Sequence, residues 1–160
     1  MKYFLTLIFC IAVLTVTREK IKESRKREKL LSEILFLIRH LKNEIGFYLK
    51  PIGKALENFT TDTPELSEFI FAVRSGKDIK SAYLRLSESS DLTDETKKVL
   101  ERTFSALGTS YLEENLKILG SAEEQLFRSH KEMEERCAQS EKIIQTLSAT
   151  LCAAVIIAVI

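Results

Sequence analysis

Two acidic groups are the first side chains of this sequence that could do chemistry. Glu113-Glu114 and the run from Glu132 to Glu135 could serve as metal ligands or as a general acid and base. That chemistry needs a pocket that positions the carboxylates and shifts their pKa values. Both groups fall on amphipathic helical patterns, where exposed carboxylates usually solvate or form ion pairs. We therefore favour a solvated helix face over a catalytic site.

Histidines and cysteines are too few and too scattered to indicate a metal centre or a disulfide framework. His40 and His130 lie far apart, and no C-x-x-C pair joins any two of Cys10, Cys137 and Cys152. His40 neighbours an apolar helical stripe and His130 lies on another, so we interpret both as structural histidines.

Motifs of phosphate-binding and nucleophilic enzymes do not occur in the sequence. None of the five glycines forms a phosphate-cradling loop, and there is no G-x-S-x-G motif. We therefore expect a protein that is not an enzyme, with no catalytic residue, no cofactor and no metal. A membrane-bound hydrolase with an unrecognised site stays open as an alternative, which pocket geometry would decide.

Positive charge gathers in one short run, although the net charge of the chain is only +1. The seven basic residues of this run are Arg18, Lys20, Lys22, Arg25, Lys26, Arg27 and Lys29. The run lacks interleaved aromatic side chains and the chain has no strong global field, so we expect no nucleic-acid partner. Its position directly after an apolar segment indicates contact with membrane lipid headgroups.

Both ends of the chain are free of charge. Residues 3–16 and residues 143–160 contain no ionisable acidic or basic side chain. The first segment could be the core of a signal peptide, but only Lys2 precedes it and no small-residue cleavage site follows, so we favour a retained anchor. The last segment is marginal for spanning, and a re-entrant or partner-packed helix stays open.

These segments divide the chain into three expected parts. Residues 1–17 form an N-terminal transmembrane anchor, residues 18–142 a helical bundle, and residues 143–160 a C-terminal hydrophobic transmembrane helix. Basic residues next to a membrane segment prefer the cytoplasmic side, so the central bundle is expected in the cytoplasm.

Apolar periodicity predicts a long helix at each end of the bundle, and we expect the two to pair antiparallel. The stripe of the first helix consists of Leu30, Ile34, Ile38, Leu41, Ile45 and Tyr48. Pro51 should end that helix near residues 49–50. The heptad seam of the last helix consists of Leu112, Leu116, Leu119, Leu126, Met133, Cys137, Ile144, Leu147 and Leu151. Because this seam crosses Lys142, we expect one continuous helix from the bundle into the apolar tail.

Shorter helices are expected between these two. One begins at Pro51, and another has Pro64 in its first turn, with Asp62 and Glu65 spaced as a capping box. The next boundary is a helix stop at Gly76.

Three further signals complete the expected helices. Asp78 is placed to cap the helix that follows Gly76. A further helix is expected from about Asp94 to Leu107, closed by Gly108. Ser110 and Glu113 form a capping box for the final helix. No strand pattern occurs. The expected fold is all-α, a membrane-anchored antiparallel bundle of about six helices whose long first and last helices run into terminal transmembrane segments.

Several short motifs add a family resemblance to this interpretation. Beside the basic run and the terminal apolar helix, they are residues 41–45 with Glu44 and Ile45, residues 50–57 with Pro51, Ala55 and Leu56, and residues 107–110 with Gly108 and Ser110. In this order they resemble the stage III sporulation protein AB family of endospore-forming bacteria, over essentially the whole chain.

That family is in turn similar to the cytoplasmic domain of the F-type platform protein of type II secretion systems. The shared turns correspond here to residues 51–56, to Ser75-Gly76-Lys77 and to residues 108–112. The sequence departs from the pattern in having Tyr111 where a second glycine is expected, and in having one bundle where the platform protein has two.

The resemblance implies a non-enzymatic platform in the channel-like complex between mother cell and forespore, required for engulfment-stage progress. Its partners would be a cytoplasmic secretion-type ATPase, the AA protein of the same set, and other membrane subunits. It would lie in the mother-cell membrane that faces the forespore, and self-association into a homo-oligomer stays open. The alternative is an anchored coiled-coil scaffold or adaptor unrelated to sporulation, with loosely attached middle helices.

Overall fold

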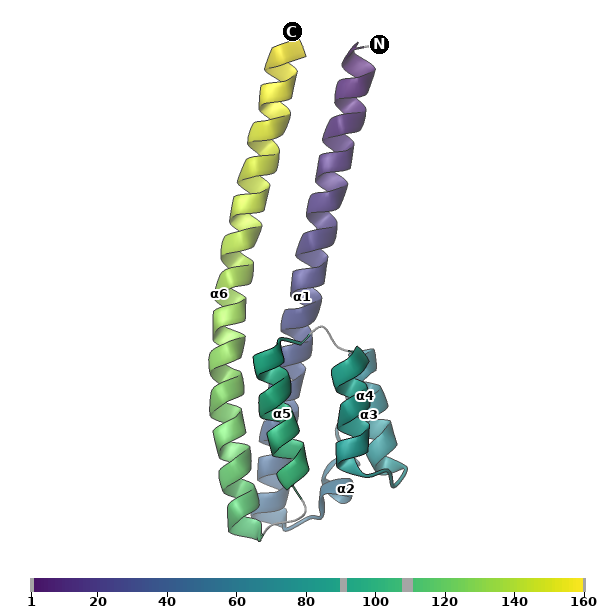
Figure 1. The fold of residues 1–160 in the computed structure, drawn as a ribbon, viewed down its shortest axis with the longest axis vertical. Helices are drawn as coiled ribbons and strands as arrows, with labels where there is room; N and C mark the ends of the chain where they lie inside the picture. The colour runs from purple at the N-terminus through teal and green to yellow at the C-terminus, as the bar shows by residue number, and fades with distance from the viewer. Residues whose placement is uncertain (1, 90–91, 108–110, 160) are drawn as a thin grey trace. The chain divides into compact units, whose positions relative to one another are not determined.

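The computed structural model describes the backbone of residues 2–89, 92–107 and 111–159, which form six α helices and no strand (Figure 1). The helices are α1 (Lys2–Tyr48), α2 (Ile52–Ala55), α3 (Pro64–Arg74), α4 (Ile79–Ser89), α5 (Asp94–Ala106) and α6 (Leu112–Val159). The all-α fold class expected from the sequence is confirmed.

The long first and last helices are continuous, as expected. α1 has 47 residues and α6 has 48, and each runs from the polar part of the chain into a charge-free end. α1 ends at Tyr48, and Leu49 takes a left-handed φ of 52°. Pro51 lacks a backbone donor and disfavours helical geometry at Lys50, which explains why the helix stops there.

The chain forms two compact units. We call Met1–Glu28 with Glu132–Ile160 the terminal unit, and Lys29–Lys131 the central unit. Among the residues that the structure describes, no helix is long and apolar enough to cross a membrane. The transmembrane segments expected at residues 1–17 and 143–160 are not confirmed, and the division of the chain at residues 18 and 142 stays a prediction.

Buried faces of α1 and α6 form one side of the central unit's core. The α1 stripe is buried from Leu30 to Ile45, and Leu31, which lies outside the stripe, is also 0% exposed. Tyr48, in contrast, is 66% exposed because it lies in the last turn of the helix. On α6, Leu119 and Leu126 are fully buried. The expected apolar periodicity therefore marks the core correctly from Leu30 to Ile45 and at Leu119 and Leu126. Leu112 of the expected α6 seam is 40% exposed, and in the terminal unit the seam residues Leu147 and Leu151 are 63% and 43% exposed, so the seam is wrong at these positions.

Two contacts show that α1 and α6 are antiparallel in the central unit. Arg39 Nε lies 2.9 Å from a Glu123 carboxylate oxygen, and a methyl group added at Gly46 would lie 3.1 Å from the Leu116 side chain. As the residue number rises along α1, the contacted residue number falls along α6. The antiparallel pairing expected from the sequence is thus present in this unit (Figure 1).

The shorter helices α3, α4 and α5 share an aromatic core. The Phe104 ring lies 5.1 Å from the Phe69 ring and 5.5 Å from the Tyr83 ring, centroid to centroid. The Tyr83 hydroxyl donates a hydrogen bond to the Lys97 carbonyl at 2.5 Å, and burial raises the pKa of Tyr83 to about 12. Gly76 stops α3 with a φ of 85°, as expected.

Helix-start signals were predicted with mixed success. Asp78 caps α4 as expected, accepting a hydrogen bond from the Ser81 amide at 3.3 Å. The capping box at Asp62 and Glu65 is wrong, because Thr63 occupies the N-cap position and its side chain makes no cap hydrogen bond. Gly108 and Ser110, expected to close α5 and cap α6, lie outside the described residues.

Candidate functional site

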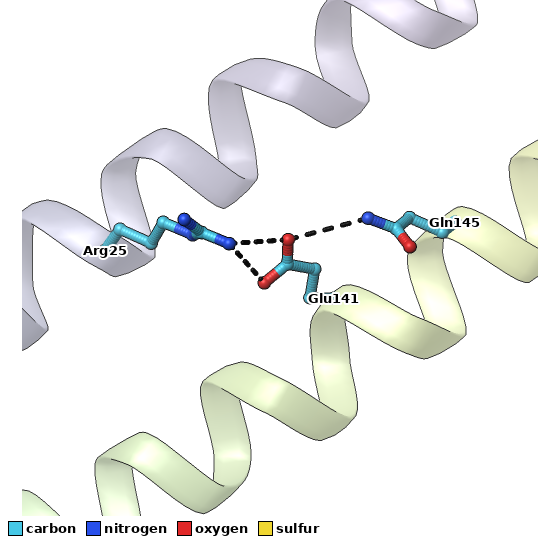
Figure 2. A network of polar contacts seen from close by, with 3 residues as sticks. All are labelled: Arg25, Glu141 and Gln145. Carbon is cyan, nitrogen blue, oxygen red and sulfur yellow. Dashed lines mark hydrogen bonds and ion pairs between the residues drawn. The ribbon is translucent and has the colours of Figure 1, made fainter.

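Ion pairs with nearby carboxylates neutralise part of the basic run, so the run is not a uniformly positive surface. Arg25 Nη2 donates to both carboxylate oxygens of Glu141 on α6, at 2.8 and 2.9 Å, and Gln145 Nε2 donates to the same carboxylate at 3.5 Å (Figure 2). This hydrogen-bonded pair raises the pKa of the Arg25 guanidinium. Arg25 therefore ties α1 to α6 within the terminal unit.

The other basic residues of the run have different surroundings. Arg27 pairs with Glu23 one turn earlier at 2.9 Å, and Lys29 lies 3.7 Å from Glu33 and 3.9 Å from Asp62 in the central unit. The side chains of Arg18, Lys20, Lys22 and Lys26 are exposed on α1. Their contact with membrane lipid stays a prediction.

A cavity of about 250 Å³ lies beside the Arg25–Glu141 pair in the terminal unit. Its lining includes Lys20, Ile21 and Cys137. The Cys137 thiol lies 3.9 Å from the Ser24 carbonyl oxygen, and burial, with the nearby Glu28 and Glu141 carboxylates, raises its pKa. The thiol is therefore protonated at neutral pH and is no reactive nucleophile.

The family-motif residues of the central unit have structural roles. Ile45, Ala55 and Leu56 are buried, with 5%, 1% and 0% of their surface exposed. Glu44 pairs with Lys50 at 2.5 Å, which brings the chain after α1 back towards the helix. Pro51 then occupies the N-cap position of α2.

Two side chains bind the carbonyl groups at the end of α2, and sequence reasoning missed both contacts. His40 Nε2 lies 2.8 Å from the Ala55 carbonyl oxygen, and Arg74 donates to the carbonyls of Leu56, Glu57 and Phe59. These groups are 15 to 18 residues apart in sequence. No local pattern indicates such pairs, because they form only when the helices pack.

Large apolar side chains are exposed at one end of the central unit. Their exposed fractions are 82% for Phe47, 66% for Tyr48, 68% for Leu49, 89% for Tyr111 and 40% for Leu112. The antiparallel register of α1 and α6 places these five residues, which we call the apolar end, at the same end of the helix pair (Figure 1). Sequence reasoning missed this surface, because it assigned Tyr48 and Leu112 to buried stripes.

A second exposed aromatic lies elsewhere on the central unit. Phe71 is 72% exposed and lines a cavity of about 350 Å³ between α3 and α4. Phe69 and Ala72 contribute apolar walls, while Glu68 and Arg85 add charges of opposite sign. The mixed lining gives no preference for a ligand charge.

The carboxylates whose pKa values are shifted act as ion-pair partners. Hydrogen bonds from Lys42 and Arg39 lower the pKa of Glu123, although burial opposes them. At Glu33, burial acts to raise the pKa of the carboxyl group. Hydrogen bonds from Thr61 and Thr63 and the charge of Lys29 outweigh burial, so the pKa of Glu33 is lowered. Both groups stay ionised at neutral pH, which suits an ion pair rather than a general acid.

Metal binding has no support within the described part of the chain. No group of three or more His, Cys, Asp and Glu side chains there could hold an ion. The acidic residues of α6 that the sequence offered as metal ligands are exposed: Glu113, Glu114, Glu132, Glu134 and Glu135. Glu132 pairs with Arg136 one turn away at 3.8 Å.

Comparison with known proteins connects the whole chain to one family. The sequence model of stage III sporulation protein AB matches residues 2–160. No curated protein and no solved structure matches the chain.

Proposed function

Since the chain belongs to the stage III sporulation protein AB family, whose members are components of a sporulation complex, we propose that it is a non-enzymatic membrane platform of that complex. Its central unit docks a cytoplasmic secretion-type ATPase, the AA protein of the same set. Its charge-free ends hold it in the mother-cell membrane that faces the forespore and contact other membrane subunits. In this role it is required for sporulation to progress through engulfment.

The apolar end is the observation that supports docking most directly. Monomeric proteins seldom expose a contiguous group of large apolar side chains unless another molecule covers it. Here three consecutive residues, Phe47 to Leu49, are each more than 60% exposed, and Tyr111, at the same end of the helix pair, is 89% exposed. Aromatic side chains of this kind contribute most of the binding free energy in protein interfaces.

The backbone at Leu49 supports the same surface. Leu49 occupies a common type of helix C-cap, in which the Lys50 amide donates to the Glu44 carbonyl at 3.3 Å, but its left-handed φ is more costly for leucine than for the glycine usually found there. A glycine at this position would close the helix with less strain. The leucine places an apolar side chain in solvent instead, which is consistent with a docking contact.

The packing of the middle helices argues against the scaffold alternative. Leu56, Leu66 and Leu100, which lie on or beside α2, α3 and α5, are each 0% exposed. Helices that were loosely attached to a coiled coil would leave these side chains partly accessible. The buried core favours a compact docking body.

A pull-down with the AA-type ATPase tests this function. We expect the double variant Phe47→Ser and Tyr111→Ser to weaken ATPase capture by roughly tenfold or more, since a lost hot-spot residue costs about 2 kcal/mol. The matched control is Phe71→Ser, which removes an aromatic that is 72% exposed on α3 but lies outside the apolar end. Equal capture by the double variant and the control would contradict docking through the apolar end.

Membrane attachment rests on the charge-free ends. Residues 3–16 and 143–160 carry no charge, and the basic run flanks the first of them. Single cysteines at positions 2, 90 and 160, in a chain whose three native cysteines are replaced by alanine, can be labelled with a membrane-impermeant maleimide. We expect position 90 to react only after the cells are opened. Recovery of the full chain in the soluble fraction would contradict the proposal.

A further inference from the structure

The cavity of the terminal unit combines positive charge with an apolar wall. Three cations, Lys20, Arg25 and Arg27, line it together with two carboxylates, Glu23 and Glu141, so the lining carries a net charge of +1. Arg25 pairs with Glu141, and Arg27 pairs with Glu23. Within the described residues no ion pair includes Lys20, which makes it the uncompensated charge of the cavity.

The remaining lining is suited to an amphipathic ligand. Ser24 and Ser140 add hydroxyl groups, which both donate and accept hydrogen bonds. Ile21 and Ile144 add aliphatic surface. Ile144 already belongs to the charge-free segment 143–160, so the apolar wall of the cavity continues into that segment.

The position of Lys20 along α1 agrees with the depth of a lipid headgroup. Lys20 follows residue 17 by three positions, which is about 4.5 Å along a helix axis. The polar layer on each side of a bilayer is roughly 5–7 Å deep. Arg25 lies eight positions beyond residue 17, about 12 Å, and is therefore outside this layer.

We propose that this cavity binds the headgroup of one anionic phospholipid, whose phosphodiester pairs with Lys20 and whose apolar part lies against Ile21 and Ile144. The proposal rests on membrane insertion of the charge-free ends, as proposed above. A phosphodiester carries a single negative charge, which matches the net charge of the lining. A phosphate monoester carries a charge of about −1.5 to −2, which the Glu23 and Glu141 carboxylates of the lining repel more strongly than a single charge. Free phosphate is therefore disfavoured.

Lipid retention by the full-length chain tests the assignment. The protein is purified in non-ionic detergent micelles doped with phosphatidylglycerol or with phosphatidylcholine, and retained lipid is counted by native mass spectrometry. We expect one retained phosphatidylglycerol and a several-fold lower retention of phosphatidylcholine. Lys20→Ala should lower phosphatidylglycerol retention about tenfold, and added sn-glycerol 3-phosphate should not displace the lipid.

Lys22→Ala is the matched control, since it removes the same charge from the same run but lies outside the cavity lining. General attraction to an anionic surface depends little on which of two neighbouring lysines is removed. Equal losses in the two variants, or no preference for phosphatidylglycerol, would overturn the site.

A second variant separates shape from charge. Ser140→Trp fills the cavity without changing its charge, and Ser140 is exposed enough for the helix to tolerate it. We expect this variant to lose phosphatidylglycerol retention as Lys20→Ala does, and unchanged retention would contradict the site. Insertion into phosphatidylcholine vesicles is measured alongside. Insertion without phosphatidylglycerol preference defeats only the headgroup site, whereas failure to insert defeats the proposed membrane attachment.

Discussion

At the scale of single residues, Arg74 shows how one side chain can hold a connection in place. Its guanidinium donates to the carbonyls of Leu56 at 2.5 Å, Glu57 at 2.6 Å and Phe59 at 2.8 Å. Carbonyls at a helix C-terminus have no partner within the helix, and a cation there also suits the helix dipole. Arg74 therefore fixes the end of α2 and the chain that follows it.

Replacing Arg74 by alanine should lower the free energy of unfolding by about 2 kcal/mol, because three carbonyls lose hydrogen bonds from a charged donor. Urea denaturation of the full-length chain in detergent, followed by circular dichroism, measures the change. Arg102→Ala, on an exposed part of α5, is the control and should stay within about 0.5 kcal/mol of the parent. A similar cost in the two variants would show that the Arg74 contacts do not stabilise the fold.

Leu49 offers a test that separates stability from docking. Leu49→Gly should raise the free energy of unfolding by about 0.5–1 kcal/mol, because glycine adopts a positive φ without the clash that leucine meets. The same change removes an exposed apolar side chain, so ATPase capture should fall. Leu84→Gly, at a 47% exposed position inside α4, should instead destabilise the protein by about 1 kcal/mol. A destabilised Leu49→Gly variant would contradict the strain at this position.

At the scale of helices, Glu123 connects α6 to α1 in the central unit. Its carboxylate oxygens lie 2.9 Å from Arg39 Nε and 2.9 Å from Lys42 Nζ. The Arg39 guanidinium also lies over the Phe127 ring, 5.7 Å from its centroid. One acidic residue thus holds two cations of the partner helix, and these contacts favour the observed register.

The contribution of Glu123 should depend on pH. Hydrogen bonds from Lys42 and Arg39 lower its pKa in the folded state below the ordinary value of 4.5. A lowered pKa means that the stabilisation is complete well above pH 4.5 and is lost as the pH falls through the folded-state pKa. Glu123→Gln should cost about 1 kcal/mol at pH 7, and the difference from the parent should shrink in acid.

Glu124→Gln is the control for this titration. Glu124 is the neighbour of Glu123, and its ion pair with Arg128 lies within α6; the Glu124 side chain is 66% exposed. We expect a change of less than about 0.5 kcal/mol and little dependence on pH. Thermal unfolding of the three proteins between pH 3 and pH 7 measures the effect. A Glu123→Gln difference that stays constant over this range would contradict the ion-pair explanation.

At the scale of the whole molecule, the described chain consists of a central unit with a continuous core and a terminal unit of two paired helical ends. Phe104 lies at the centre of that core, 1% exposed and in contact with Phe69 and Tyr83. Because α3, α4 and α5 meet at this ring, they should unfold together rather than one by one.

Phe104→Ala should destabilise the central unit by about 3–5 kcal/mol, since it leaves a cavity where three helices meet. Limited proteolysis should then cut between α3 and α5, at sites that are protected in the parent. Phe71→Ala, on the surface of α3, should leave the digestion pattern unchanged. Rapid cutting of the parent at these sites would instead favour a scaffold with loosely attached middle helices.

The sequence by itself determined the features that depend on near neighbours. The apolar spacing from Leu30 to Ile45, Pro51, Gly76 and Asp78 predicted long helices, their boundaries and the all-α class correctly. Each of these signals acts within a few residues, through side-chain periodicity or through the φ that a residue allows. The short motifs along the chain also indicated the family that the comparison shows.

Only the tertiary structure decided which side chains meet and which stay exposed. Arg39 and Glu123 are 84 residues apart, and Arg25 and Glu141 are 116 apart, so no local pattern could pair them. The apolar end is a similar case, because periodicity marks a helix face but not how far a partner helix covers it. Burial depends on the packing of distant elements. That packing paired Arg25 of the basic run with Glu141 and left Phe47 and Tyr48 in solvent.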